Sequence, residues 1–239
     1  MRLHRFYVSQ PLGEEVVIDG VSLVHQWTKV FRYTAGDFVI LFNGDGIDYS
    51  YSIVSLSQKQ CTLALQSSSP VYIPTKKTYL YLAIIKKDNF EIAVQKATEL
   101  GVTDVVPIVS ARTEKKHVDT RRLQLIVQEA TEQSGRGDIL RVHEPIDFAS
   151  ITDTVQKNNG SPARTFVATT HGEPLSTVLQ NVSPADNSPC AFVVGPEGGW
   201  TDAEEEYFKN ENVTRVTFGK TILRAETAAI VSSFLSVII

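Results

Sequence analysis

The sequence predicts an α/β protein in which a small all-β segment precedes a larger α/β domain. Up to about residue 72, short β-like runs are separated by turn residues, whereas from residue 79 apolar runs alternate with helical patterns. A composition of 42% hydrophobic and 21% charged residues over 239 residues is typical of a folded globular chain. We therefore expect a small barrel over residues 1–72 and a domain with a mostly parallel sheet over residues 73–239.

The front segment contains four runs with the composition of β-strands. Asn43 to Gly46, between two of these runs, holds residues that tolerate positive φ, which predicts a hairpin turn. Ser67 to Pro70, followed by Pro74, interrupts the pattern and predicts a domain boundary. The segment is therefore expected to be all-β, with strands over residues 15–18, 38–42, 49–56 and 61–65.

The second segment begins with the continuous apolar run 79–85, which is typical of a strand buried on both faces. Asp88, with Glu91 three residues on, is expected to cap the helix that follows, and Gly101 to end it. Pro107 places the next strand, 105–109, at a sheet edge or a bulge. The buried face of the next helix is predicted to be Leu123, Ile126, Val127 and Ala130, and further strands to cover 165–169, 191–194 and 213–218.

Several classes of protein are excluded by what the sequence lacks. No apolar run reaches the roughly 18 residues of a membrane span, and the basic start is not followed by the apolar segment of a signal peptide. A cytoplasmic protein is therefore expected. Cys61 and Cys190 are far apart, so we expect two buried thiols rather than a disulfide framework. No motif of a hydrolase or a metal site is present, so no metal is expected.

Charge is unevenly distributed along the chain. The formal net charge is -4, yet residues 73–145 hold twelve of the 23 Lys and Arg residues, in pairs such as Lys86 and Lys87. A solvated surface is the ordinary interpretation of such pairs, and a phosphate-binding face is the alternative.

The most informative motif is the glycine-rich turn Gly195 to Gly199. It follows an apolar strand, and Thr201 with Glu204 then forms a capping box that opens a helix. Ligands of open α/β sheets collect at the carboxyl ends of strands, where glycines let backbone amides approach them. The spacing is neither that of a P-loop nor that of a dinucleotide fingerprint. We therefore predict a ligand-binding loop, in which Trp200 either stacks on a base or fastens the helix to the core.

Arg224 stands at the start of the apolar C-terminal helix. The positive end of the helix dipole disfavours a cation there unless an anion or a carbonyl faces it. A ligand contact is one explanation, and a salt bridge with Glu226 or Glu197 is the other. His171 follows the strand that ends near Thr170, at the expected ligand-facing edge, although a lone histidine is more often structural.

Five motifs occur together in this chain: Arg2 to Phe6, Glu91 to Val102, Glu132 to Arg136, Gly195 to Gly199, and Ile222 to Ala228. In this combination and order the chain resembles the ribosomal RNA small-subunit methyltransferase E family, which methylates N3 of a uridine in 16S rRNA. The resemblance implies a PUA-like β-barrel over residues 1–72 and a SPOUT α/β domain over residues 73–239. It also implies a C-terminal trefoil knot, with the knot and the cofactor site in about residues 165–239.

The resemblance further implies S-adenosyl-L-methionine as cofactor, a homodimer, and 16S rRNA within the assembled small ribosomal subunit as partner. The implied cofactor-binding residues are Thr170, His171, Gly195, Pro196, Glu197, Gly198, Gly199, Phe218, Gly219, Ile222, Leu223, Arg224, Ala225 and Thr227. The implied RNA-binding residues are Arg2, His4, Arg5, Arg32, Lys86, Lys87 and Arg136.

The chemistry implied by the resemblance requires uracil N3 to lose its proton and displace a methyl group from a sulfonium. Arg224 and Arg136 are candidates to stabilise negative charge on the uracil carbonyl oxygens. Glu197 is the candidate proton acceptor, with Glu226 as the other. Two alternatives stay open: another SPOUT methyltransferase, acting on a ribose 2′-O or a tRNA base, and a non-catalytic RNA-binding assembly factor. A nucleotide-binding metabolic enzyme is disfavoured, because no phosphate-loop fingerprint is present.

Overall fold

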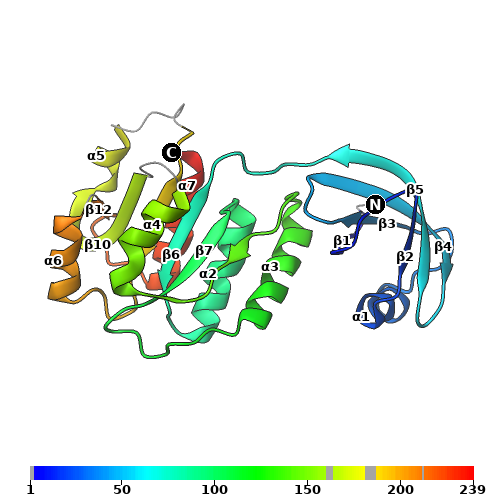
Figure 1. Ribbon diagram of the computed structural model, residues 1–239, viewed down its shortest axis with the longest axis horizontal. Coiled ribbons are helices and arrows are strands. Elements are labelled where there is room, and N and C mark those ends of the chain that lie inside the picture. Colours follow the sequence, from blue (N-terminus) through cyan, green and yellow to red (C-terminus); the bar gives the residue numbers. More distant parts are fainter. Residues whose placement is uncertain (1–2, 160–163, 181–186, 212) are drawn as a thin grey trace. The chain divides into compact units, whose positions relative to one another are not determined.

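The computed structural model describes residues 3–159, 164–180, 187–211 and 213–239. Its contacts divide the chain into two units (Figure 1). The first unit comprises Met1–Ile73 with Thr131–Asp138, and the second comprises Pro74–Ala130 with Ile139–Ile239.

The first unit is built on a five-stranded sheet in the order β1-β3-β4-β5-β2. The four predicted strands are confirmed, and β5 continues through Pro70, so the Ser67–Pro70 cluster lies inside a strand and does not interrupt it. Strands β1 and β2, at the two ends of the order, are not paired with each other within the described residues, so the sheet is a half-barrel. The strands are β1 (Arg5–Tyr7), β2 (Glu15–Ile18), β3 (Phe38–Phe42), β4 (Ile47–Leu56) and β5 (Cys61–Pro70).

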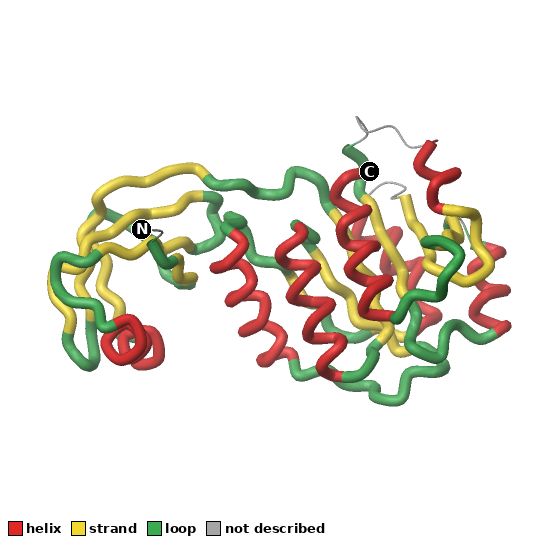
Figure 2. Tube along the Cα trace, turned by 180° about the vertical axis from the view of Figure 1, so that it is seen from behind, coloured by secondary structure: helices red, strands yellow, loops and turns green. Residues whose placement is uncertain are grey.

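The prediction that the first segment is all-β is wrong for residues 21–31. Helix α1 (Val21–His25) runs into a π-helical turn, η1 (Gln26–Phe31), which Figure 2 draws beside the strands of this unit. Val24 and Trp27 are fully buried and lie three residues apart, so one helical face packs on the sheet. Leu23 and Phe31 pack on the same cluster. The segment is rich in valine and aromatic residues, which favour strands, so its composition does not reveal a helix.

The second unit is an α/β domain around a parallel sheet in the order β12-β10-β11-β6-β7-β8, with β9 also paired to β7 (Figure 1). Every pairing in this sheet is parallel, as the alternation of strands and helices predicts. The strands are β6 (Thr78–Ala83), β7 (Asp104–Val109), β8 (Arg141–Val142), β9 (Ile146–Asp147), β10 (Arg164–Pro174), β11 (Cys190–Val194) and β12 (Thr214–Thr217).

Helices cover both faces of this sheet. Leu80 and Leu82 of β6 pack in one core cluster with α2, α3 and α7, which lie side by side in Figure 2. Tyr79 and Tyr81 face the opposite way and pack in a second cluster with α4 and α6. The apolar run that begins β6 is therefore buried on both faces, as predicted. The helices are α2 (Lys87–Leu100), α3 (Thr120–Ser134), α4 (Ile151–Asn159), α5 (Leu175–Gln180), α6 (Asp202–Asn210) and α7 (Ala225–Ile238), with a 3₁₀ turn η2 (Phe148–Ser150) before α4.

Helix α2 ends where the sequence predicts but is not capped by the predicted residue at its start. Gly101 ends the helix in the left-handed conformation, with φ of 96°, as expected. The expected cap is wrong: α2 begins at Lys87, its N-cap Lys86 makes no side-chain cap bond, and Asp88 lies inside the first turn. The Lys86 N–H donates to Glu197 Oε1 at 2.9 Å, so the acceptor at this helix start comes from a distant loop.

Strand β7 is not at an edge, contrary to what Pro107 suggested. It pairs with β6 on one side and with the short strands β8 and β9 on the other. On that second side the pairs involve Asp104, Val105, Ile108 and Val109, so Pro107 falls in the gap between the two partners. A residue without an N–H is tolerated at a position where no ladder bond is required.

Cys61 and Cys190 are buried free thiols, as predicted. Burial raises the pKa of each to about 11, so neither is a reactive thiolate at neutral pH. In the described part of the chain, no helix is both long and apolar enough to cross a membrane.

Candidate active site

The predicted cofactor-binding segments meet at one edge of the second unit's sheet. Strands β6, β7, β10, β11 and β12 run parallel, so their carboxyl ends lie along the same edge. The loop Gly195 to Gly199 follows β11, and the segment Phe218 to Arg224 follows β12. Phe218 and Leu223 pack on the same cluster as Val194 and Ala168. The structure therefore brings together loops that are distant in sequence.

The loop Gly195 to Gly199 is an ordered turn at the end of a buried strand. The Gly199 N–H donates to the Pro196 carbonyl at 2.8 Å, and Gly199 has φ of 68°. The predicted capping box is confirmed, since Thr201 accepts from the Glu204 N–H and Glu204 accepts from the Thr201 N–H. The backbone N–H groups of Glu197 and Gly198 have no partner among the residues that the structure describes. Both residues are exposed, so these donors are available to a ligand.

Trp200 is a structural residue of this loop. It is 8% exposed, its Nε1–H donates to the Ala168 carbonyl at 3.0 Å, and its ring packs against Phe148 and Phe208. Of the two interpretations of Trp200, fastening the helix to the core is therefore the one that its surroundings support.

Arg112 is a residue of this edge that the sequence analysis missed. It follows β7, and its Nη1 donates to the carbonyls of Gly198, at 2.6 Å, and Trp200, at 3.1 Å. Its position just beyond a strand's carboxyl end is the one signal that sequence reasoning could have used. Nothing local predicts which loop the side chain reaches.

Thr170 and His171 lie in an irregular part of β10. Val216 of β12 is in register with both Ala168 and Glu173, so residues 169–172 form a bulge. Thr170 and His171 are exposed on this bulge. A β-carbon on Gly172 would lie 2.5 Å from the backbone of Arg215 and Val216, so only glycine allows this close approach.

Arg224 is the N-cap of α7 and makes no side-chain cap bond. Its side chain is exposed and forms no hydrogen bond or ion pair with any residue in the described part of the chain. The salt bridge to Glu226 or Glu197 proposed as the alternative is therefore absent from this part of the structure. An unpaired cation at the positive end of a helix costs free energy, which favours a ligand contact.

Glu226, in the first turn of α7, carries an oxygen that needs a partner. Its Oε2 is buried, with no hydrogen-bond partner among the described residues. A buried carboxylate oxygen without a donor is costly. The Glu226 oxygen is an acceptor, whereas the N–H groups of Glu197 and Gly198 and the side chain of Arg224 are donors. This edge can therefore bind a ligand that carries both positive and negative charge. S-adenosylmethionine, with a carboxylate, an ammonium, a sulfonium and hydroxyls, has groups that these residues fit.

The residues predicted to bind RNA are distributed over both units. Lys86 and Lys87 are exposed at the start of α2. His4 is exposed in the first unit, where its ring is 4.4 Å from that of Phe31, and Arg32 is exposed with a left-handed φ of 56°. Arg2 lies outside the described residues.

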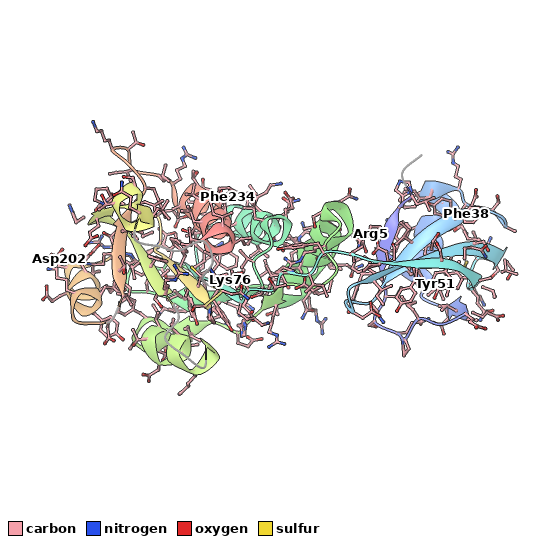
Figure 3. The ribbon with its side chains drawn as sticks, turned by 90° about the horizontal axis from the view of Figure 1, so that it is seen from above. Arg5, Phe38, Tyr51, Lys76, Asp202 and Phe234 are labelled. Atoms are coloured by element: carbon pink, nitrogen blue, oxygen red, sulfur yellow. The ribbon has the colours of Figure 1, made fainter. Side chains whose placement is uncertain are left out.

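Two of these predicted residues, Arg5 and Arg136, are buried. Arg136 is 4% exposed and binds Asp138 through two N–H···O bonds of 2.9 and 2.8 Å. Arg5, labelled in Figure 3, is 8% exposed and binds Asp48 through bonds of 2.8 and 2.7 Å. It also donates to the Thr131 and Arg136 carbonyls. These contacts favour a structural role for both side chains in the first unit.

Comparison with known proteins shows to which family of proteins this chain belongs. Residues 73–237 match the family model of the RNA methyltransferase domain, and residues 28–66 match that of the RNA methyltransferase PUA domain. A half-barrel and a parallel-sheet domain with this loop edge are thus the two parts of an RNA methyltransferase. The chain is 32% identical to the ribosomal RNA small subunit methyltransferase E of Rickettsia conorii, covering 96% of this chain and 93% of that protein. It belongs to the ribosomal RNA small subunit methyltransferase E family.

Two further proteins agree with this assignment. The chain is 29% identical to the ribosomal RNA small subunit methyltransferase E of Bacillus subtilis, over 86% of this chain and 83% of that protein. It is also similar to the crystal structure of ribosomal RNA small subunit methyltransferase E from Neisseria gonorrhoeae bound to S-adenosyl methionine. That similarity has a TM-score of 0.81 at 25% identity and covers 97% of this chain and 95% of that one.

Proposed function

We propose that this protein is an S-adenosylmethionine-dependent methyltransferase that methylates N3 of a uridine in 16S rRNA. The observation that carries the proposal is the loop edge of the second unit, where the donors of Glu197 and Gly198 and the side chain of Arg224 are open to a ligand. Family membership supports the same reaction. The predicted cofactor-binding residues, from Thr170 to Thr227, remain part of this proposal.

When bound, S-adenosylmethionine supplies a methyl group on a positively charged sulfonium, which is already activated for transfer. The protein's task is to place uracil N3 in line with that methyl group and to remove the N3 proton. Arg224 donates hydrogen bonds to a uracil carbonyl oxygen and stabilises the negative charge that develops there. Arg136 is the second candidate for this role, and its side chain can act only if its two hydrogen bonds to Asp138 open.

Glu197 is the proposed proton acceptor. Its Oε1 accepts the Lys86 N–H at 2.9 Å, which fixes the carboxylate, while its Oε2 has no partner among the described residues. Glu226 is the other candidate, because its Oε2 lacks a partner as well. The substitution Glu197→Gln separates the two roles of Glu197: glutamine can still accept the Lys86 N–H but cannot take the proton. We expect Glu197→Gln to retain cofactor affinity and lose turnover, and Glu226→Gln to retain turnover.

Three further features of the family are proposed for this protein. The first is a trefoil knot in about residues 165–239. It is supported by the bulge of residues 169–172, where the backbone of β10 lies unusually close to that of β12. A homodimer is the second, supported by Phe234 (Figure 3) and Ile238 of α7, which are both 51% exposed. The third is a cytoplasmic location, where the substrate is 16S rRNA within the assembled small ribosomal subunit. Analytical ultracentrifugation tests the homodimer.

The experiment that tests the proposed function is isothermal titration calorimetry of the protein with S-adenosylmethionine, followed by methyl transfer to 16S rRNA. Binding and transfer of a labelled methyl group support the proposal. Binding to RNA without heat from S-adenosylmethionine would instead favour the non-catalytic assembly factor. Labelled tRNA or a labelled ribose would favour another methyltransferase of the same fold.

A further inference from the structure

Arg112 lies against the Gly195–Gly199 loop although it belongs to the loop after β7. Its Nη1 donates to the Gly198 carbonyl at 2.6 Å and to the Trp200 carbonyl at 3.1 Å. A β-carbon on Gly198 would lie 3.2 Å from Cδ of Arg112. The side chain of Arg112 therefore packs on the loop backbone and binds carbonyls on either side of Gly199.

The backbone of Arg112 is anchored on both sides. Before and after it, Ser110 and Thr113 are 5% and 8% exposed, and the Thr113 N–H donates to the Ser110 carbonyl at 3.1 Å. The N–H of the preceding residue, Ala111, donates to Glu204 Oε1 at 2.9 Å. Glu204 also completes the capping box of α6, so its carboxylate is held in place. The backbone from which the Arg112 side chain extends is therefore fixed by hydrogen bonds.

Among the residues that the structure describes, the side chain of Arg112 bonds to backbone carbonyls and not to other side chains. It forms no ion pair with a carboxylate in the described part of the chain, and its side-chain hydrogen bonds go to neutral carbonyls. Hydrogen bonds from a charged donor are stronger than neutral ones. The planar guanidinium holds its donors in a rigid fork, whereas a lysine ammonium is a point charge on a flexible stem.

Arg112 binds the carbonyls of Gly198 and Trp200, and this restricts the conformation of the loop between them. The N–H groups of Glu197 and Gly198 stay without partners among the described residues. Donors that are fixed before a ligand arrives bind it more tightly, because the ordering of the loop does not have to occur on binding.

We propose that Arg112 is a positioning residue that holds the Gly195–Gly199 loop in the shape that binds S-adenosylmethionine. This inference rests on the proposed function. Arg112 acts through the loop carbonyls and not by touching the reacting atoms. Lysine at this position keeps the charge and reaches one carbonyl, so it retains part of the effect.

The test compares four full-length proteins: wild type, Arg112→Ala, Arg112→Lys and the control Arg122→Ala. Arg122 pairs with Glu91, which lies on α2 and not on the loop, so its removal controls for loss of an exposed arginine. In calorimetry with S-adenosylmethionine we expect affinity to fall about tenfold or more in Arg112→Ala. We expect a smaller fall in Arg112→Lys and none in Arg122→Ala. In turnover assays KM for S-adenosylmethionine rises, while kcat at saturation changes little.

Hydrogen exchange of the peptide that contains residues 195–200, measured without cofactor, gives a readout independent of activity. We expect faster exchange in Arg112→Ala and wild-type exchange in Arg122→Ala. If Arg112→Ala does not fold, Arg112→Lys decides by the same two measurements. Wild-type affinity together with wild-type exchange in the Arg112 variants would overturn the inference. Failure of the wild type to bind S-adenosylmethionine would contradict the proposed function instead, and the exchange data would still decide whether Arg112 holds the loop.

Discussion

The indole ring of Trp200 lies so close to Gly195 that a β-carbon on Gly195 would be 2.9 Å from ring atom Cε2. The ring cannot easily move away, because its Nε1–H is bonded to the Ala168 carbonyl and the ring packs in a T-shaped arrangement with Phe208. The strand-to-loop turn after β11 therefore requires glycine at position 195 for space.

The first prediction follows from this contact. Gly195→Ala forces the indole out of its position, and overpacking of this kind costs about 1–3 kcal/mol of unfolding free energy. Urea denaturation measures the cost, and calorimetry with S-adenosylmethionine measures the loss of affinity that a displaced loop produces. Gly13→Ala is the matched control, since nothing lies within 4 Å of its added β-carbon. Equal stability of the two variants would show that the loop tolerates the shift.

The second prediction concerns Arg224. Removing a donor that stabilises charge in a transition state typically lowers kcat by about 10²–10³. We expect Arg224→Ala to reduce turnover by this order while its thermal unfolding matches that of wild type, because the exposed side chain has no partner in the described residues. Lys209→Ala, which removes an exposed cation paired with Glu206 on α6, is the control. Wild-type kcat in Arg224→Ala would remove this residue from the mechanism.

The third prediction concerns the buried ion pair of Arg5 and Asp48, whose side chains are 6% and 12% exposed. The guanidinium also lies 4.2 Å from the centre of the Phe42 ring. Arg5→Ala leaves a buried carboxylate without its cation, which typically costs about 3–5 kcal/mol. Urea denaturation of the variant measures this cost.

The control for the Arg5 variant is Lys96→Ala, which breaks the exposed pair of Lys96 and Glu99 and should change stability by less than about 1 kcal/mol. The double variant Arg5→Met with Asp48→Leu should recover much of the loss, because no charge is then left buried. If Arg5→Ala unfolds at the wild-type urea concentration, the pair has no structural importance and a surface role for Arg5 regains support.

The fourth prediction is a pH dependence that comes from Asp104 at the start of β7. Burial by itself raises the pKa of this carboxyl, but hydrogen bonds from His143 and Thr103 and the charge of Lys77 outweigh it and hold the pKa below its ordinary 3.8. A carboxyl whose pKa is lower in the folded state contributes stability above the unfolded value, and that stability is lost as pH falls through the folded value.

We therefore expect Asp104→Asn to be less stable than wild type at pH 6, with the difference shrinking as pH falls below about 4. Unfolding temperatures of both proteins at a series of pH values provide the measurement. A difference that is constant from pH 6 down to the lowest pH at which both proteins fold would show that the ionised carboxylate contributes nothing.

The sequence predicts best what is decided locally. The capping box of Thr201 and Glu204 involves residues three apart, and the left-handed Gly101 ends a helix of clear period, so both were found. The cap of α2 was not, because the acceptor Glu197 is 111 residues from Lys86. Arg112 was missed for the same reason, since its carbonyl partners lie on a different loop.

Burial was equally hard to foresee from sequence. Arg5 and Arg136 are basic residues within the resemblance motifs, and a basic side chain is ordinarily expected at a surface. Nothing in the sequence indicates that Asp48 and Asp138 will bind these two arginines. The helical segment at 21–31 was missed because it is rich in valine and aromatic residues, which favour strands.

The most direct test of the central claim is the identity of the methylated nucleoside. The wild-type protein is incubated with labelled S-adenosylmethionine and small ribosomal subunits that lack this modification. Nucleosides from the digested 16S rRNA are then separated by liquid chromatography and identified by mass spectrometry. We predict that the label elutes with 3-methyluridine, and that Arg224→Ala lowers the initial rate of labelling by about 10²–10³. Label in a 2′-O-methylated nucleoside, or no label in the presence of bound S-adenosylmethionine, would contradict the claim.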